Sequence, residues 1–145
     1  GLLKSPVDGT VSLVFPTGHA IGLKSKNGAE ILIHIGMDTV ELNGEGFEVL
    51  VSKDQEVKAG QPLVKFDLDA IKAKGYDLTT PVIITNSKSY QEIGDSKRGA
   101  VKASDQLLTL STCLDEDRLV IRARRQREGE KTASLREIVN MAVRQ

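Results

Sequence analysis

Short runs of β-branched and aliphatic residues, each ending near a turn sequence, fill most of residues 1–110 of this 145-residue chain. Turn-forming pairs such as Asn27-Gly28 and Asn43-Gly44 separate the runs, and many short strands at such spacing fold as a sandwich or a barrel. We therefore predict an all-β fold, a β-sandwich or hybrid barrel of short antiparallel strands. The predicted strands cover residues 10–15, 19–23, 30–35, 47–51, 62–66, 82–85 and 106–110, and a short connector helix covers residues 68–74.

The composition excludes several classes of protein. With 20 Lys and Arg against 20 Asp and Glu, the chain is not a strongly basic nucleic-acid binder, and its 39% hydrophobic content argues against disorder. The single cysteine, Cys113, cannot form a disulfide framework. No apolar run approaches the roughly 20 residues that span a bilayer, and no signal-peptide pattern is present. We expect a cytoplasmic protein that is not inserted in a membrane.

The last 35 residues differ in composition from the rest of the chain. Residues 1–110 contain 11 Lys and one Arg, whereas residues 111–145 contain seven Arg and one Lys. So sharp a change predicts one main domain at residues 1–110 and a tail of separate origin at residues 111–145.

The tail is predicted to hold a strand, a basic linker and a C-terminal helix, at residues 118–123, 124–130 and 134–145. The helix prediction rests on a capping box, Ser134 with Glu137, followed by one apolar face. That face must be buried against its own domain, a second copy of the chain or a docking partner.

The chain has two histidines, His19 and His34, and each stands in a predicted strand between apolar neighbours. Alternation along the second strand places His34 on one face with Glu30 and Leu32. The opposite, core-forming face holds Ile31, Ile33 and Ile35. A lone histidine in such a strand is more often a structural residue. Two of them, in strands joined by one tight turn, favour a shared site.

A histidine pair without Ser, Cys or a carboxylate dyad fits poorly with hydrolysis, and two ligands leave a zinc site incomplete. One imidazole can instead accept a phosphoryl group while the other donates a hydrogen bond to its oxygens, and the Thr17 hydroxyl can orient that second ring. No cofactor is required for this chemistry. We also predict that His19 and His34 take part in a zinc site where another protein or a crystal neighbour supplies the missing carboxylate or water ligands, and that the isolated monomer binds zinc only weakly.

Three stretches surround the histidines, and their order and spacing are distinctive: SPVDGTV at residues 5–11, FPTGHAI at 15–21 and IHIGMDTVELNGEGF at 33–47. Together with VKAGQ, FDL and TPV further along, they resemble the glucose-type EIIA domain of the bacterial phosphoenolpyruvate-dependent sugar phosphotransferase system. The resemblance extends over about residues 2–110, and the block that starts at His34 is its most specific part.

The resemblance implies a phosphocarrier with a phosphohistidine intermediate. His34 corresponds to the histidine that takes the phosphoryl group from phospho-HPr and passes it to a cysteine of an EIIB domain for sugar uptake. His19 corresponds to the supporting histidine, and Thr17 to the threonine hydrogen-bonded to it.

Three more residues match positions of the family's partner-binding face, namely Phe15, Asp38 and Val40. The charge of Asp38 would face the basic rim of HPr or EIIB. The alternative for Asp38 is a turn residue that caps local backbone amides.

The chain departs from the family in two ways, because the family's domain begins earlier and has no counterpart of the Arg-rich tail. We therefore expect a partial EIIA-like domain whose strand edges are covered by the tail, either within one chain or exchanged between copies of a homo-oligomer.

Two other functions stay open. Residues 6–11 and 57–63 resemble the strand and turn pattern of biotinyl or lipoyl carrier modules, although no lysine stands in the setting those modules modify. The other alternative is a non-catalytic binding or structural chimera. Nucleic-acid binding is not expected, because no aromatic residues accompany the arginines of the tail.

Overall fold

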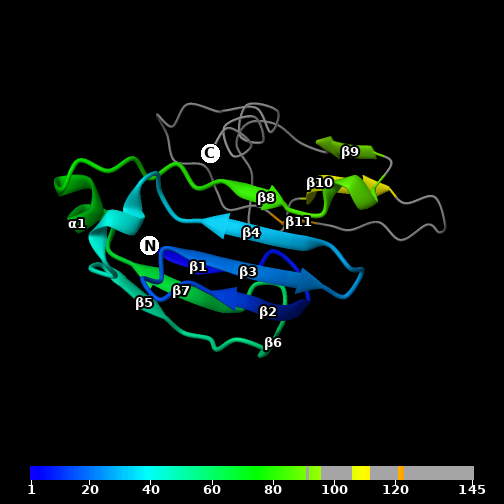
Figure 1. Ribbon diagram of the computed structural model, residues 1–145, viewed down its shortest axis with the longest axis horizontal. Helices are drawn as coiled ribbons and strands as arrows, with labels where there is room; N and C mark the ends of the chain where they lie inside the picture. Colours follow the sequence, from blue (N-terminus) through cyan, green and yellow to red (C-terminus); the bar gives the residue numbers. More distant parts are fainter. Residues whose placement is uncertain (91, 96–105, 112–120, 123–145) are drawn as a thin grey trace. The chain divides into compact units, whose positions relative to one another are not determined.

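The structure is a computed structural model that describes residues 1–90, 92–95, 106–111 and 121–122. The chain divides into two compact units, Gly1–Thr85 and Asn86–Gln145. Figure 1 shows the elements of the first unit, which in chain order are β1 (Leu2–Lys4), β2 (Gly9–Val14), β3 (Ala20–Ser25), β4 (Glu30–His34), η1 (Thr39–Leu42), β5 (Phe47–Val49), β6 (Glu56–Val57), β7 (Pro62–Phe66), α1 (Leu68–Ala73) and β8 (Val82–Ile84).

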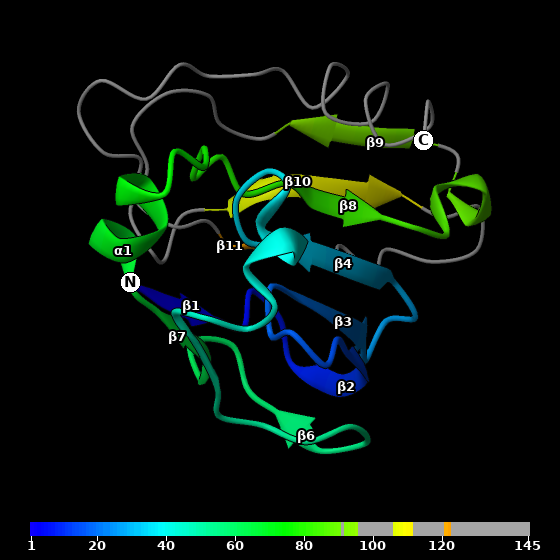
Figure 2. The ribbon, with the colours of Figure 1, turned by 60° about the vertical axis from the view of Figure 1, so that its left-hand side comes forward.

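The strands of the first unit form two antiparallel sheets (Figure 2). One has the order β1-β7-β5 and the other the order β6-β2-β3-β4-β8. The predicted fold class of short antiparallel strands with a connector helix is therefore confirmed. Among the described residues, no helix is long and apolar enough to cross a bilayer.

The core consists of aliphatic side chains, as the scarcity of aromatic residues requires. Along β4 the side chains alternate as predicted, and Ile31, Ile33 and Ile35 are at most 1% exposed. Side chains of the paired strand β3 are buried beside them, including Ile21 and Leu23. Burying each such side chain contributes about 1.5–3 kcal/mol, so the strand that carries His34 is held firmly from its apolar face.

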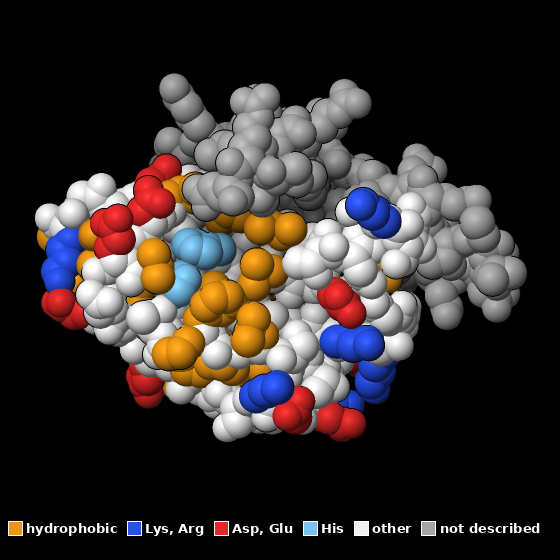
Figure 3. All heavy atoms as spheres, viewed as in Figure 1, with side chains coloured by type: hydrophobic (Ala, Val, Ile, Leu, Met, Phe, Trp, Pro, Cys, Tyr) orange, Lys and Arg blue, Asp and Glu red, His pale blue; other side chains and the backbone are white. Residues whose placement is uncertain are grey.

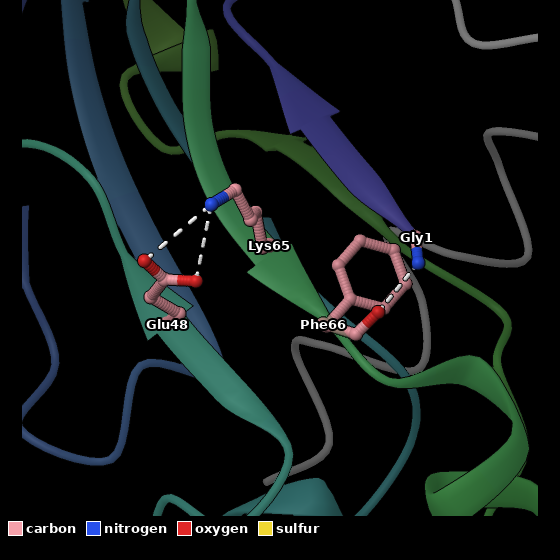
Figure 4. Close-up of polar contacts among 4 residues, drawn as sticks. All are labelled: Gly1, Glu48, Lys65 and Phe66. Atoms are coloured by element: carbon pink, nitrogen blue, oxygen red, sulfur yellow. Dashed lines mark hydrogen bonds and ion pairs between the residues drawn. The ribbon is translucent and has the colours of Figure 1, made fainter.

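Two strands of the first unit were not predicted from the sequence, β1 and β6. With three and two residues they are too short to show an alternating pattern, and they form because β7 and β2 offer open edges for pairing. Figure 4 shows the edge contacts of β7: Lys65 lies opposite Glu48 of β5 with the charged atoms 3.3 Å apart, and the Gly1 amine donates to the Phe66 carbonyl.

The second unit contains η2 (Ser87–Ser89) and an antiparallel sheet of β9 (Glu92–Asp95), β10 (Gln106–Ser111) and β11 (Ile121–Arg122), in the order β11-β10-β9. The strand β10 was predicted, β11 lies inside the predicted strand at 118–123, and β9 was not predicted. The predicted linker, the predicted helix at 134–145 and the covering role of the tail lie outside the described residues. The predicted boundary at residue 110 is a statement about the separate origin of the two segments, and it stays a prediction. The division into compact units lies elsewhere in the chain, after Thr85.

Candidate functional site

His34 is the last residue of β4 and lies on the face opposite to the buried isoleucines. Its backbone amide donates to the Pro81 carbonyl at 3.1 Å, beyond the end of the ladder that joins β4 to β8. The side chain is half-buried, because the alternation that buries Ile33 and Ile35 turns position 34 outward. The strand thus presents one imidazole at the surface on a rigid support.

His19 directly precedes β3 and lies beside His34. Strands β3 and β4 pair with Ala20 opposite His34, and the Ile35 amide donates to the His19 carbonyl at 2.7 Å. The two ring centroids are 4.8 Å apart, with the ring planes at 67° to each other. The imidazoles therefore share one face, as the sequence predicted for paired strands.

The turn before β3 fixes the orientation of the His19 ring. The Gly18 amide donates to the Phe15 carbonyl at 2.8 Å, and the φ angle of 68° at Gly18 suits a glycine. The Thr17 hydroxyl forms a hydrogen bond with Nδ1 of His19, and the Phe15 ring lies 5.3 Å from the His19 ring. The structure thus brings together Phe15, Thr17, His19 and His34.

The turn after β4 determines which ring nitrogen of neutral His34 carries the proton. Nδ1 of His34 lies 2.6 Å from the carbonyl oxygen of Gly36. A carbonyl oxygen can only accept, so Nδ1 carries the proton and the lone pair of the neutral ring is on Nε2. This arrangement leaves Nε2 as the ring nitrogen of His34 that has an available lone pair.

The sequence prediction missed the role of the Gly36 carbonyl and the segment that supports it. The Met37 amide donates to the Asp77 carbonyl at 2.8 Å, which holds the peptide plane between Gly36 and Met37 from its other side. A glycine directly after the strand was the available signal for a special backbone conformation. Nothing in the sequence indicated that a residue 41 positions further along would fix it.

The two histidines differ in burial and in charge. His19 is 4% exposed. Its burial, followed by the positive charge that His34 can acquire, holds the pKa of His19 below its ordinary value of 6.5. His19 is therefore neutral at physiological pH, with one ring nitrogen as donor and one as acceptor.

Asp38 and Val40 are exposed just beyond His34, at and within η1. Asp38 has a left-handed backbone with φ 56°, but its side chain makes no capping hydrogen bond to η1, so the capping alternative is wrong. The Tyr76 hydroxyl donates to Glu41 at 3.0 Å, and this bond, with burial and the charges of Glu41 and Asp38, raises the pKa of Tyr76.

Val40 is 48% exposed, and among the residues whose burial is described only Leu2 and Leu13 are other large apolar side chains exposed in this way. Figure 3 shows the histidines at the surface among hydrophobic side chains, with carboxylates to one side. No hydrogen bond or ring contact joins Asp38 or Val40 to the histidine rings among the described residues. Asp38 and Val40 are exposed on the turn that follows His34, and we call this turn, together with Phe15, the rim of the histidine pair.

The part of the chain that the structure describes holds no group of three or more His, Cys, Asp or Glu side chains suited to a metal ion. The histidine pair offers two imidazole ligands, fewer than a tetrahedral zinc site needs. The geometry by itself suits a nucleophile with a hydrogen-bonding neighbour.

Comparison with known proteins places the chain in a family. The family "phosphoenolpyruvate-dependent sugar phosphotransferase system, EIIA 1" matches residues 1–90, and the chain belongs to that family. The chain is 45% identical over 112 residues to the glucose-specific EIIA component of Staphylococcus epidermidis, an alignment that covers 77% of this chain and 68% of the relative.

Two further similarities extend this result. The chain is 50% identical over 111 residues to the beta-glucoside-specific EIIBCA component of Bacillus subtilis, which covers 77% of this chain and 18% of that protein. The solved structure of glucose permease IIA from Mycoplasma capricolum is 36% identical, with a TM-score of 0.57, and covers 83% of this chain and 70% of that one. The chain is thus a phosphotransferase component of the EIIA type, which works through a phosphohistidine intermediate.

Proposed function

We propose that Nε2 of His34 is the atom that accepts the phosphoryl group from phospho-HPr and later yields it to an EIIB domain. The observation that carries this proposal is the 2.6 Å hydrogen bond from Nδ1 of His34 to the Gly36 carbonyl, since it leaves the lone pair on Nε2. As the new P–N bond forms, the P–N bond to the donor imidazole breaks and its electron pair returns to that ring. In the second transfer a cysteine thiolate of EIIB attacks phosphorus, and Nε2 recovers its electron pair.

We propose that His19 stabilises the transferring group. Its ring is neutral because its pKa is lowered, and the Thr17 hydroxyl donates to Nδ1 in this assignment. The ring proton is then on Nε2, where it can donate to a phosphoryl oxygen of phosphorylated His34. A fixed donor aimed at developing negative charge lowers the barrier without reorganisation during the reaction.

The rim around the histidines suits two basic partners in turn. Phe15 is half-buried and Val40 is exposed, so they offer apolar contact area. Asp38 and Glu41 add exposed carboxylates at the same turn. We propose that HPr and EIIB both use this rim, because complementary charge speeds encounter and apolar contacts supply affinity.

The similar proteins support an EIIB acceptor and leave the sugar open. One relative is named glucose-specific and another beta-glucoside-specific, and the latter is an EIIBCA component. We propose that the chain serves sugar uptake from the cytoplasmic side, where a lone cysteine is stable as a thiol. The family match gives no support to a biotinyl or lipoyl carrier or to a non-catalytic chimera.

The direct test is phosphorylation of the full chain with phosphoenolpyruvate, the general phosphotransfer enzyme and HPr, read by intact mass. The proposal predicts a gain of one phosphoryl group, and a reaction without HPr is the control. Addition of an EIIB domain should then return the mass to its starting value. A folded chain that gains no mass would contradict the proposal, whereas a shift matching biotin or lipoate would support the carrier module.

Zinc binding by His19 and His34 stays a proposal in which a second protein supplies the remaining ligands. No cofactor is needed for phosphoryl transfer between nitrogen and sulfur atoms. Calorimetry of the chain alone should show weak zinc binding, because two imidazoles leave the tetrahedron open. Tight, stoichiometric binding would contradict this view.

A further inference from the structure

The Gly36 carbonyl can direct His34 only if the backbone at position 36 is fixed. Gly36 has φ 78°, a left-handed conformation, and it lies just beyond the end of β4. A Cβ atom at this position would lie 2.6 Å from Cγ2 of Thr39 and 2.8 Å from the Asp77 carbonyl oxygen. The chain therefore turns at Gly36 in a space that Thr39 and the Asp77 backbone enclose.

The two peptide groups that flank Gly36 are each held by a hydrogen bond. In the peptide group that follows Gly36, the Met37 amide donates to the Asp77 carbonyl at 2.8 Å. In the peptide group that precedes Gly36, the Ile35 carbonyl accepts from the Thr39 hydroxyl at 2.6 Å. Thr39 is 0% exposed, so neither water nor a partner protein can replace this bond.

The Asp77 side of this arrangement is supported by its own turn. One carboxylate oxygen of Asp77 accepts from the Thr79 amide at 2.8 Å and from the Thr79 hydroxyl at 2.9 Å. Among the described residues, the Thr39 side rests on one buried side chain, which supplies both the hydroxyl bond and the methyl contact. Thr39 is therefore the side chain on which the position of the Gly36 carbonyl most depends.

We propose that Thr39 is a positioning residue for phosphoryl transfer: it holds the Gly36 turn so that the Gly36 carbonyl keeps the proton of His34 on Nδ1 and leaves Nε2 able to attack. The proposal rests on the proposed function of His34. Thr39 does not touch the reacting atoms, and its effect reaches them only through the backbone carbonyl. Loss of the hydroxyl lets the turn relax and increases the share of His34 rings that carry the proton on Nε2.

The test measures which ring nitrogen of neutral His34 carries the proton. Long-range proton–nitrogen correlation NMR of the full chain with labelled histidine distinguishes the two forms. In the wild type, the Nδ1–H form should predominate for neutral His34. In Thr39→Val, which keeps the shape but lacks the hydroxyl, the share of the Nε2–H form should rise severalfold. Phosphoryl acceptance from phospho-HPr should slow on the order of tenfold, the scale of one lost hydrogen bond.

Thr39→Ser keeps the hydroxyl and loses only the methyl group, so its effect should be smaller but measurable. The matched control is Ser5→Ala, which also removes a buried hydroxyl that donates to a backbone carbonyl, that of Val7 at 2.7 Å. Ser5→Ala should lower stability and leave the His34 spectrum unchanged. A change in that spectrum equal to the change in Thr39→Val would overturn the proposal, because general loosening would then explain both.

Several results would contradict the role of Thr39. One is a folded Thr39→Val chain with the wild-type His34 spectrum and a wild-type rate. Another is a wild-type chain whose neutral His34 is mainly in the Nε2–H form. If Thr39→Val does not fold, Thr39→Ala, which also lacks the hydroxyl, takes its place, and an unchanged His34 spectrum in that variant overturns the proposal. The spectra need no phosphoryl donor, so a chain that shows the predicted shifts but accepts no phosphate would count against the proposed function alone.

Discussion

His34 ends β4 and His19 directly precedes the paired strand β3, with ring centroids 4.8 Å apart, yet the turns next to them give the two rings different hydrogen-bond partners. His34 is half-buried, and a backbone carbonyl that can only accept holds its Nδ1. His19 is 4% exposed, and a hydroxyl that can donate or accept holds its Nδ1. In the proposed function, the hydrogen-bond partner of Nδ1 decides which imidazole attacks and which one assists.

The largest predicted effect comes from removing the attacking ring. His34→Gln should abolish phosphate acceptance from phospho-HPr, because an amide nitrogen has no available lone pair. Intact mass after incubation with the complete donor system measures this directly, and circular dichroism checks that the variant is folded. Undiminished acceptance in a folded His34→Gln chain would move the reaction to another residue.

Removing the assisting ring should have a smaller effect of a different kind. We expect His19→Gln to accept phosphate and to pass it to EIIB about 10²–10³-fold more slowly, the range found when one donor to a developing anion is lost. Single-turnover transfer from the phosphorylated variant measures the rate. If His19→Gln instead accepted no phosphate while remaining folded, the division of roles between the rings would be wrong.

The turn after β4 can be tested through the free energy of unfolding, because a residue other than glycine at position 36 would be strained there. Gly36→Ala adds a Cβ that meets Thr39 and the Asp77 carbonyl, and it forces alanine to φ 78°. The expected loss is about 3 kcal/mol from strain and overpacking together. The control Gly28→Ala shares the positive φ but meets nothing within 4 Å, so it should cost about 1 kcal/mol.

Urea unfolding of both glycine variants supplies the measurement. Equal losses in Gly36→Ala and Gly28→Ala would show that Thr39 and Asp77 can move aside at little cost. The turn would then be too soft to hold the Gly36 carbonyl against His34.

These sites also show how far the sequence leads. The alternation around Ile31, Ile33 and Ile35 predicted which face His34 occupies, and the strand pairing placed His19 beside it. The hydrogen bond between Thr17 and His19 could be predicted because both residues lie in one short turn, and the family resemblance implied it as well. Local patterns suffice where the contacts are local.

The remaining features depend on distant residues or on backbone detail. The Gly36 carbonyl is held with help from Asp77, whose approach is set by the path of the chain through α1 and the loop before β8. The left-handed backbone at Asp38 leaves its carboxylate without a capping role, although aspartate is a common capping residue. Strands as short as β6 form only because a partner edge is present.

The smallest predicted effect concerns pH and stability. Burial, with the nearby positive charge of His34, lowers the pKa of folded His19 below 6.5, so the unfolded chain binds more protons just below that pH. Stability should therefore be fully present above about pH 6.5 and decline as pH falls through the window below it. The free energy of unfolding of His19→Gln, measured with urea, should decline less than that of the wild type between pH 7.5 and 5.5. An equal decline in both proteins would contradict the effect of His19 burial.

The most direct test of the central claim is to identify the phosphorylated atom. Nitrogen-15 and phosphorus-31 NMR of the chain phosphorylated through HPr distinguish the two ring nitrogens of each histidine. We expect one phosphoryl group on Nε2 of His34, with the proton retained on Nδ1 next to the Gly36 carbonyl. A phosphoryl group on Nδ1 of His34, or on either nitrogen of His19, would contradict it.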